Sequence, residues 1–154
     1  MSSQNPIPDK SQRTEQDEQS RIRAYIAELS QSAYQLLREN YVREAEEKFR
    51  EILSYDETNN YALVGLGDAA RKRKDCKTAV VYYKRCLESH PKNNYALFGL
   101  ADCYKAMRHF HRAIEYWEEY LTLDDRNVTV LTRVADAYRK VENFDRSKQL
   151  YYQI

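Results

Sequence analysis

The sequence has few of the residues that tight turns require: three glycines and three prolines among 154 residues. Because sheets joined by tight turns depend on both types, their scarcity argues against a turn-rich β fold and favours helices. Cysteine is equally scarce, and the three cysteines form no CxxC pair, which argues against a disulfide framework or a cysteine metal site. No apolar run approaches the roughly 20 residues of a membrane-spanning helix.

An excess of one charge is also absent, since 25 Lys and Arg balance 24 Asp and Glu. A net charge of +1 gives no general attraction to nucleic acid or anionic membranes. The one basic run, Arg71–Lys74, falls at the expected end of a helix, where cations complement the helix dipole. RNA or DNA binding is therefore disfavoured.

The first residues are polar and lack the apolar segment of a secretory signal. Together with unpatterned cysteines, this predicts a cytoplasmic protein. Residues 1–16 consist mostly of Gln, Ser, Asp, Glu and Pro and offer almost nothing to bury. We expect them to form a disordered leader before a helical domain at 17–154.

A repeat of 34 residues dominates the rest of the chain. Asn59 to Leu63 reads NNYAL, and the same five letters return at Asn93 to Leu97. Self-similarity at this period is typical of stacked helix pairs. Apolar residues at spacings of three and four predict the helices 61–73 and 76–89, then 95–107 and 110–123, then 128–141 and 144 onward. We expect Asn60, Asn94 and Asn127 to cap helix starts.

The repeats, at about 26–59, 60–93, 94–127 and an incomplete 128–154, align in four columns. The leading apolar column is Leu29, Leu63, Leu97 and Leu131. The two small columns are Ala33, Gly67, Ala101 and Ala135, and Ala45, Ala79, Ala113 and Ser147. The aromatic column is Phe49, Tyr83, Trp117 and Tyr151. Small residues allow paired helices to approach closely, and the aromatic residue fills the gap to the neighbouring pair.

These columns resemble the tetratricopeptide repeat (TPR) family. The resemblance implies a right-handed all-α solenoid of about four repeats, with the first helix of each repeat facing a concave groove. The groove residues that we expect to bind a partner are Tyr34, Arg38, Tyr61, Val64, Asp68, Arg71, Tyr95, Phe98, Asp102, Lys105, Thr132, Asp136 and Arg139.

Two features stand out in that set, and each has an alternative explanation. Tyr61, Val64, Tyr95 and Phe98 form an apolar patch, although aromatic residues at helical spacing are often core residues. Asp68, Asp102 and Asp136 form an acidic ladder, but each stands three residues before Arg71, Lys105 or Arg139 and could make a local ion pair.

The ladder predicts a neutral or basic partner. TPR domains that clamp the carboxylate end of chaperone peptides use Asn and Lys, and the column where they place Asn holds Tyr34, Asp68, Asp102 and Asp136 here. Acids at these positions would repel such a tail.

The sequence offers no chemistry of its own. His90, His109 and His111 fall near predicted turns without metal-ligand spacing, and Cys86 and Cys103 fall on apolar helix faces. No phosphate-binding loop or nucleophile elbow is present. We therefore predict no catalytic activity, no cofactor and no metal.

The predicted function is a protein-interaction scaffold that binds a peptide or helix of a partner in the groove. The alternative is a scaffold that self-associates through its groove and an uncapped last helix, where Tyr138, Leu150, Tyr151 and Ile154 could be open. A chain cut from a longer repeat protein would explain the same open end.

Overall fold

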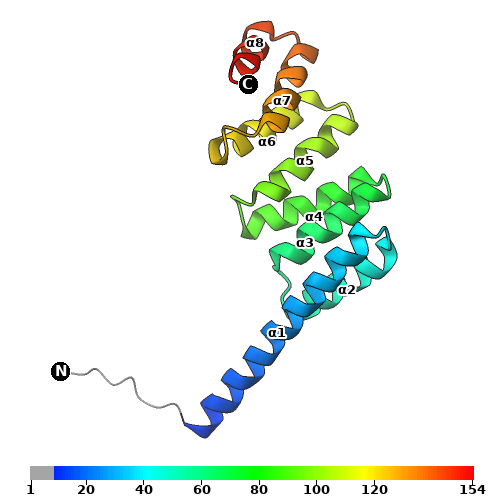
Figure 1. Ribbon diagram of the computed structural model, residues 1–154, viewed down its shortest axis with the longest axis vertical. Helices are drawn as coiled ribbons and strands as arrows, with labels where there is room; N and C mark the ends of the chain where they lie inside the picture. Colours follow the sequence, from blue (N-terminus) through cyan, green and yellow to red (C-terminus); the bar gives the residue numbers. More distant parts are fainter. Residues whose placement is uncertain (1–8) are drawn as a thin grey trace, which may run out of the picture.

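The computed structural model describes residues 9–154, which form eight α-helices and no strand. Antiparallel helix pairs stack into an elongated solenoid (Figure 1). Turns within pairs lie along one edge of the stack, and loops between pairs lie along the other. The predicted all-α solenoid of about four helix pairs is confirmed. The helices are α1 (Lys10–Arg38), α2 (Val42–Tyr55), α3 (Asn60–Lys72), α4 (Cys76–Ser89), α5 (Asn94–Ala106), α6 (Phe110–Leu123), α7 (Val128–Lys140) and α8 (Phe144–Tyr152).

Asparagine caps begin α3, α5 and α7, but two of them differ from the prediction. The capping side chains belong to Asn59, Asn93 and Asn127, which accept from amides three residues later at 3.0, 3.0 and 3.2 Å. Asn60 and Asn94 are instead the first helical residues. In each Asn-Asn pair the first asparagine is outside the helix, so its side chain can accept from the free amides of the first helical turn.

Helix α1 begins earlier than expected. Residues 1–8 of the predicted leader lie outside the described residues, but residues 10–16 are helical. Asp9 caps the helix by accepting from the Gln12 amide at 2.9 Å. The Lys, Gln, Arg and Glu that follow are good helix formers, so this stretch is helical although its side chains are exposed. The predicted boundary at residue 17 therefore falls inside a helix that extends beyond the stack (Figure 1).

The predicted columns form the core. The leucine column is buried, as are all the alanines of the two small columns, and Phe49, Tyr83 and Trp117 are fully buried. Tyr151 is the exception and is 42% exposed. Ser147, in the second small column, is also buried.

Tyr83 is held between two glycines of successive repeats. A Cβ atom added to Gly67 would lie 2.5 Å from the Tyr83 ring, and one added to Gly99 would lie 2.4 Å from it. A Cβ atom added to Gly65 would likewise lie 2.3 Å from the ring of Phe49. These three glycines therefore make room for an aromatic ring. Gly67 is the one among them that belongs to a predicted small column, and there the small residue serves the ring as well as the approach of two helix backbones.

The turn within each pair places one residue in the left-handed region. These residues are Asn40, Lys74, Arg108 and Glu142, with φ between 61° and 69°. They are spaced by the repeat period. Asparagine tolerates this conformation, whereas lysine, arginine and glutamate adopt it at a cost in free energy.

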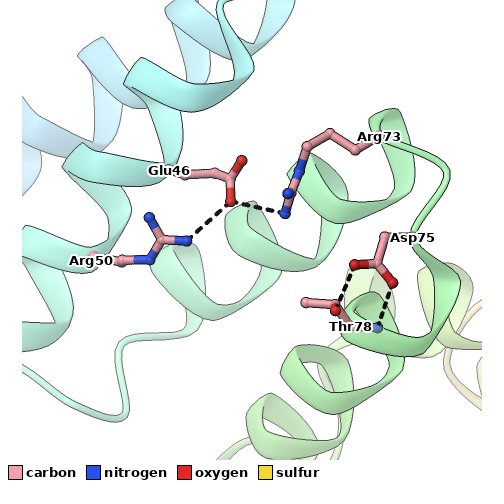
Figure 2. Close-up of polar contacts among 5 residues, drawn as sticks. All are labelled: Glu46, Arg50, Arg73, Asp75 and Thr78. Carbon is pink, nitrogen blue, oxygen red and sulfur yellow. Dashed lines mark hydrogen bonds and ion pairs between the residues drawn. The ribbon is translucent and has the colours of Figure 1, made fainter.

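A buried carboxylate connects the first two repeats. Glu46 on α2 is 5% exposed and accepts from Arg50 at 3.2 Å and from Arg73, the residue that ends α3, at 3.0 Å (Figure 2). Asp75 then caps α4 through the amide (3.2 Å) and hydroxyl (2.7 Å) of Thr78. The first contact joins α2 to the end of α3, and the second fixes the start of α4.

The basic run predicted at a helix end is largely engaged within the fold. Arg73 contacts Glu46, the Lys72 ammonium donates to the Leu37 carbonyl at 2.7 Å, and Arg71 pairs with Asp102 at 2.9 Å. Cations held this way are poorly available to phosphates. None of the helices in residues 9–154 has the length and apolar character to cross a membrane.

Candidate binding groove

Two adjoining hollows form a groove along the first helices of the first three repeats. The larger has a volume of about 1030 Å³ and the smaller about 600 Å³. Tyr34, Arg38 and Tyr95 line both hollows, so the two are continuous. The predicted residues in this groove are Tyr34, Arg38, Tyr61, Val64, Asp68, Arg71, Tyr95 and Phe98.

The remaining predicted residues, Asp102, Lys105, Thr132, Asp136 and Arg139, lie on α5 and α7 and line neither hollow. Conversely, the larger hollow extends along α1 past Gln31 to Glu28, which sequence reasoning missed. Glu28, Gln31, Gln35 and Arg38 are spaced by three or four residues, so helical periodicity marks them as one face. That spacing was the available signal.

The predicted aromatic patch contains two exposed and two packed residues. Tyr61 and Tyr95 are 60% and 72% exposed on the groove wall, whereas Val64 is 6% exposed. Phe98 is half-buried against the Tyr120 ring, with centroids 6.2 Å apart. The core interpretation therefore holds for Val64 and partly for Phe98, and the two tyrosines remain available for contact.

Tyr34 forms the junction of the two hollows and is fixed in place. Its hydroxyl donates to the Tyr61 carbonyl at 2.6 Å, and its ring meets Phe49 edge-on at 5.0 Å. Burial raises the pKa of the Tyr34 hydroxyl well above its ordinary value, so it stays protonated. At this junction the groove therefore presents a neutral side chain that is held by two contacts.

The acidic ladder is largely engaged in contacts within the fold. Asp68 accepts a hydrogen bond from the Tyr83 hydroxyl at 2.5 Å, and burial raises the pKa of the Asp68 carboxyl. Asp102 pairs with Arg71 of the preceding repeat at 2.9 Å and with Arg133 of the following one. The predicted local pair of Asp68 with Arg71 is wrong, because the ladder connects repeats as well as helices.

The other two predicted local pairs have different outcomes. Asp136 and Arg139 form the expected pair at 3.6 Å, and Asp136 also accepts from Tyr151. Lys105 is exposed and forms no ion pair with Asp102 in the described part of the chain. The three aspartates thus make contacts within the fold, and their partners differ from one repeat to the next.

The groups capable of chemistry do not converge. Within residues 9–154 no three His, Cys, Asp or Glu side chains are grouped to hold a metal. His90 contacts the Thr58 carbonyl at 2.8 Å, and His109 stacks on Tyr104. Burial raises the pKa of Cys86 to about 11 and that of Cys103 to about 12, which keeps both thiols neutral.

The fold is a stack of helix pairs with a groove along the first helices of the first three repeats. A family model described as tetratricopeptide repeat matches residues 61–93 and 95–124, the second and third helix pairs. Residues 61–93 and 95–124 therefore carry tetratricopeptide repeats. The recognition from sequence is therefore confirmed, and with it the right-handed solenoid.

Solved structures show the same fold at low identity. A crystal structure of MamA is 19% identical with a TM-score of 0.77, over 96% of this chain and 94% of that one. A tetratricopeptide repeat protein from Parabacteroides merdae is 20% identical with a TM-score of 0.75, over 84% of this chain. The chain spans about half of that protein, 52%.

The first TPR domain of Spaghetti (RPAP3), solved with the HSP90 peptide SRMEEVD, is 13% identical with a TM-score of 0.73. The match covers 76% of this chain and 93% of that domain. No curated protein sequence matches the chain significantly.

Proposed function

We propose that the chain is a non-catalytic scaffold that binds a peptide or helix of a partner protein in its groove. The observation that carries the proposal is the pair of tyrosines, Tyr61 and Tyr95, that stay 60% and 72% exposed on the wall of a continuous groove. Rigid aromatic side chains beside a hollow are typical anchors of protein interfaces. The Spaghetti domain, of the same fold, was solved with a peptide, which supports this mode.

The charges of the groove favour a neutral or basic segment over a carboxylate-terminated tail. Asp68 lines the smaller hollow, and two of the three cations there are engaged: Arg71 by Asp102 and Lys72 by the Leu37 carbonyl. The third, Arg38, donates to the Gln35 side chain. A carboxylate entering this hollow would meet an acid, while these cations already have partners.

The test is quantitative affinity capture with the chain as bait, comparing wild type with the Tyr61→Ala/Tyr95→Ala variant. Tyr41→Ala is the matched control, because Tyr41 is 55% exposed but lies before α2, outside the groove. We expect partners to be lost with the double variant and kept with the control. Equal capture by all three folded proteins, as judged by circular dichroism, would refute groove binding.

Self-association is a second candidate function, supported by exposed side chains on α8 and just after it. Phe144 is 62%, Tyr152 80% and Ile154 54% exposed. Of the residues predicted to be open there, Tyr151 and Ile154 are exposed, but Leu150 is fully buried and Tyr138 is half-buried. Light scattering over a range of concentrations tests it: a monomer at every concentration rules it out.

We propose a cytoplasmic location as well, on the basis of the free cysteines at positions 76, 86 and 103. Cell fractionation would test it.

A further inference from the structure

The turn between α5 and α6 carries a third hollow, of about 400 Å³, that shares no lining residue with the groove. It is lined by residues 108–112 together with Lys140 and Val141 at the end of α7. Three of these residues are cationic, namely Arg108, Arg112 and Lys140, and two are histidines. None of the residues lining the hollow is acidic. The α5–α6 turn lies on the edge of the stack where the turns within helix pairs are found (Figure 1).

The three cations of this hollow lack carboxylate partners. Within residues 9–154, Arg108, Arg112 and Lys140 form no ion pair, although Glu115 and Glu142 are close in sequence. Many other arginines of the solenoid do pair with acids: Arg50, Arg71, Arg73, Arg133, Arg139 and Arg146. The hollow therefore concentrates positive charge in a chain whose net charge is only +1.

Aromatic rings hold the cations in place. The guanidinium of Arg108 and the ammonium of Lys140 lie 5.5 and 5.8 Å from the centre of the Phe110 ring. The two charges are thus at most about 11 Å apart, the sum of those distances. Arg112 lies 5.6 Å from the centre of the Tyr104 ring. Cation–π contacts restrain these side chains and leave their N–H donors able to bind an anion.

We propose that this cationic hollow binds an acidic, Asp- or Glu-rich segment of a partner protein. Two of its cations lie over the Phe110 ring and the third lies over the Tyr104 ring. Separate cations of this kind can each bind one of several carboxylates along a peptide. Alternate side chains of an extended peptide are roughly 7 Å apart. That distance is below the upper limit of about 11 Å between the charges of Arg108 and Lys140. Arginine donors match carboxylate oxygens in geometry as well as charge.

The observations favour a peptide over a nucleic acid. Nucleic acid requires a positive surface that follows several phosphates and, for single strands, open aromatic faces. Here the charge is confined to one hollow between the α5–α6 turn and the end of α7, and Phe110 is half-buried beneath two cations. The neighbouring basic run is engaged through Arg71, Lys72 and Arg73 inside the fold.

Arg108→Asn tests the hollow without threatening the fold. Arg108 has a φ of 64°, and asparagine occupies the same turn position at Asn40. The variant should therefore be at least as stable as wild type. The second variant combines it with Lys140→Gln. Lys74→Asn is the matched control, since it makes the same change of charge at the same turn position outside the hollow.

The measurement is fluorescence anisotropy with a labelled peptide that alternates glutamate and serine. Controls are the same peptide with glutamine for glutamate, a phosphoserine peptide and a single-stranded oligonucleotide. We expect the glutamate peptide to bind, to bind more weakly at high salt, and to lose roughly tenfold in affinity with Arg108→Asn/Lys140→Gln. Lys74→Asn should bind like wild type.

Four results would overturn the proposal. They are no binding of the glutamate peptide, equal binding of the glutamine peptide, equal binding by the double variant, or an equal loss with Lys74→Asn. Tighter binding of the phosphoserine peptide or the oligonucleotide would instead assign the hollow to phosphate. Because Tyr61 and Tyr95 are outside this hollow, the Tyr61→Ala/Tyr95→Ala variant should bind the peptide normally, which separates this test from that of the groove.

Discussion

The hydroxyl of Tyr83 donates a hydrogen bond of 2.5 Å to the carboxylate of Asp68, fifteen positions earlier and on the other helix of the same repeat. Tyr151 makes the same contact with Asp136 in the last repeat. In the third repeat Trp117 occupies the tyrosine position, its buried indole N–H has no partner in the described structure, and the aspartate pairs with arginines instead. An aspartate thus accepts from the aromatic residue of its own repeat where that residue is a tyrosine, and pairs with arginines alone where it is a tryptophan.

Tyr83→Phe should destabilise the fold by about 1–3 kcal/mol, because it leaves a half-buried carboxylate without its hydroxyl donor. Tyr151→Phe is the matched control. It removes the same contact at an exposed position, where an effect within about 0.5 kcal/mol is expected. Urea unfolding at neutral pH measures both. Equal effects for the two variants would show that burial of the pair is unimportant.

Asp68 should make stability depend on pH. Burial raises the pKa of its carboxyl above the unfolded value of 3.8, so the folded state binds this proton more tightly than the unfolded state does. Its contribution favours folding below pH 3.8 and is lost as pH rises through the raised folded-state pKa. Asp68→Asn keeps an oxygen acceptor for Tyr83 and cannot titrate. The variant should therefore lose less stability than wild type as pH rises from about 4 to 7, as measured by urea unfolding across that range. Parallel pH profiles would contradict the assignment.

Gly99→Ala should be destabilising by about 1–3 kcal/mol, although alanine is the better helix former. The added methyl would lie 2.4 Å from the ring of Tyr83, which is fully buried, so the ring or the helix would have to shift. In a Tyr83→Ala background the same substitution should become neutral or stabilising. A double-mutant cycle in thermal or urea unfolding measures this coupling. Additive effects would mean that the ring and the glycine do not constrain each other.

Lys74→Gly should stabilise the protein by about 0.5–1 kcal/mol, because lysine with a φ of 61° is in a conformation that glycine adopts freely. Glu142→Gly, at the same position two repeats later, should act alike. Asn40→Gly provides the control, since asparagine already tolerates this geometry and the gain should be smaller. Thermal unfolding of the three variants gives the comparison. A loss of stability in the first two would show that their side chains make contacts that outweigh the strain.

Particular residues show how much of the structure could be predicted from the sequence. The helices 76–89 and 110–123 were predicted with their observed bounds, because helical periodicity and the repeat period are both local in sequence. The small and aromatic columns were predicted for the same reason. The groove was predicted at its centre, but its extension to Glu28 was missed because the face of α1 was read only from Tyr34 onward.

Taken by itself, the sequence determined the period, the helix pairs and the identity of the core columns, since each follows from residues that are neighbours within one repeat. Only the tertiary structure decided that Val64 is buried while Tyr61 and Tyr95 stay exposed, and that Arg71 pairs with Asp102 instead of Asp68. Those outcomes depend on how one repeat packs against the next. The pair of Arg71 and Asp102, for example, joins side chains 31 positions apart. The residue pattern within one helix does not predict contacts between side chains so far apart in the sequence.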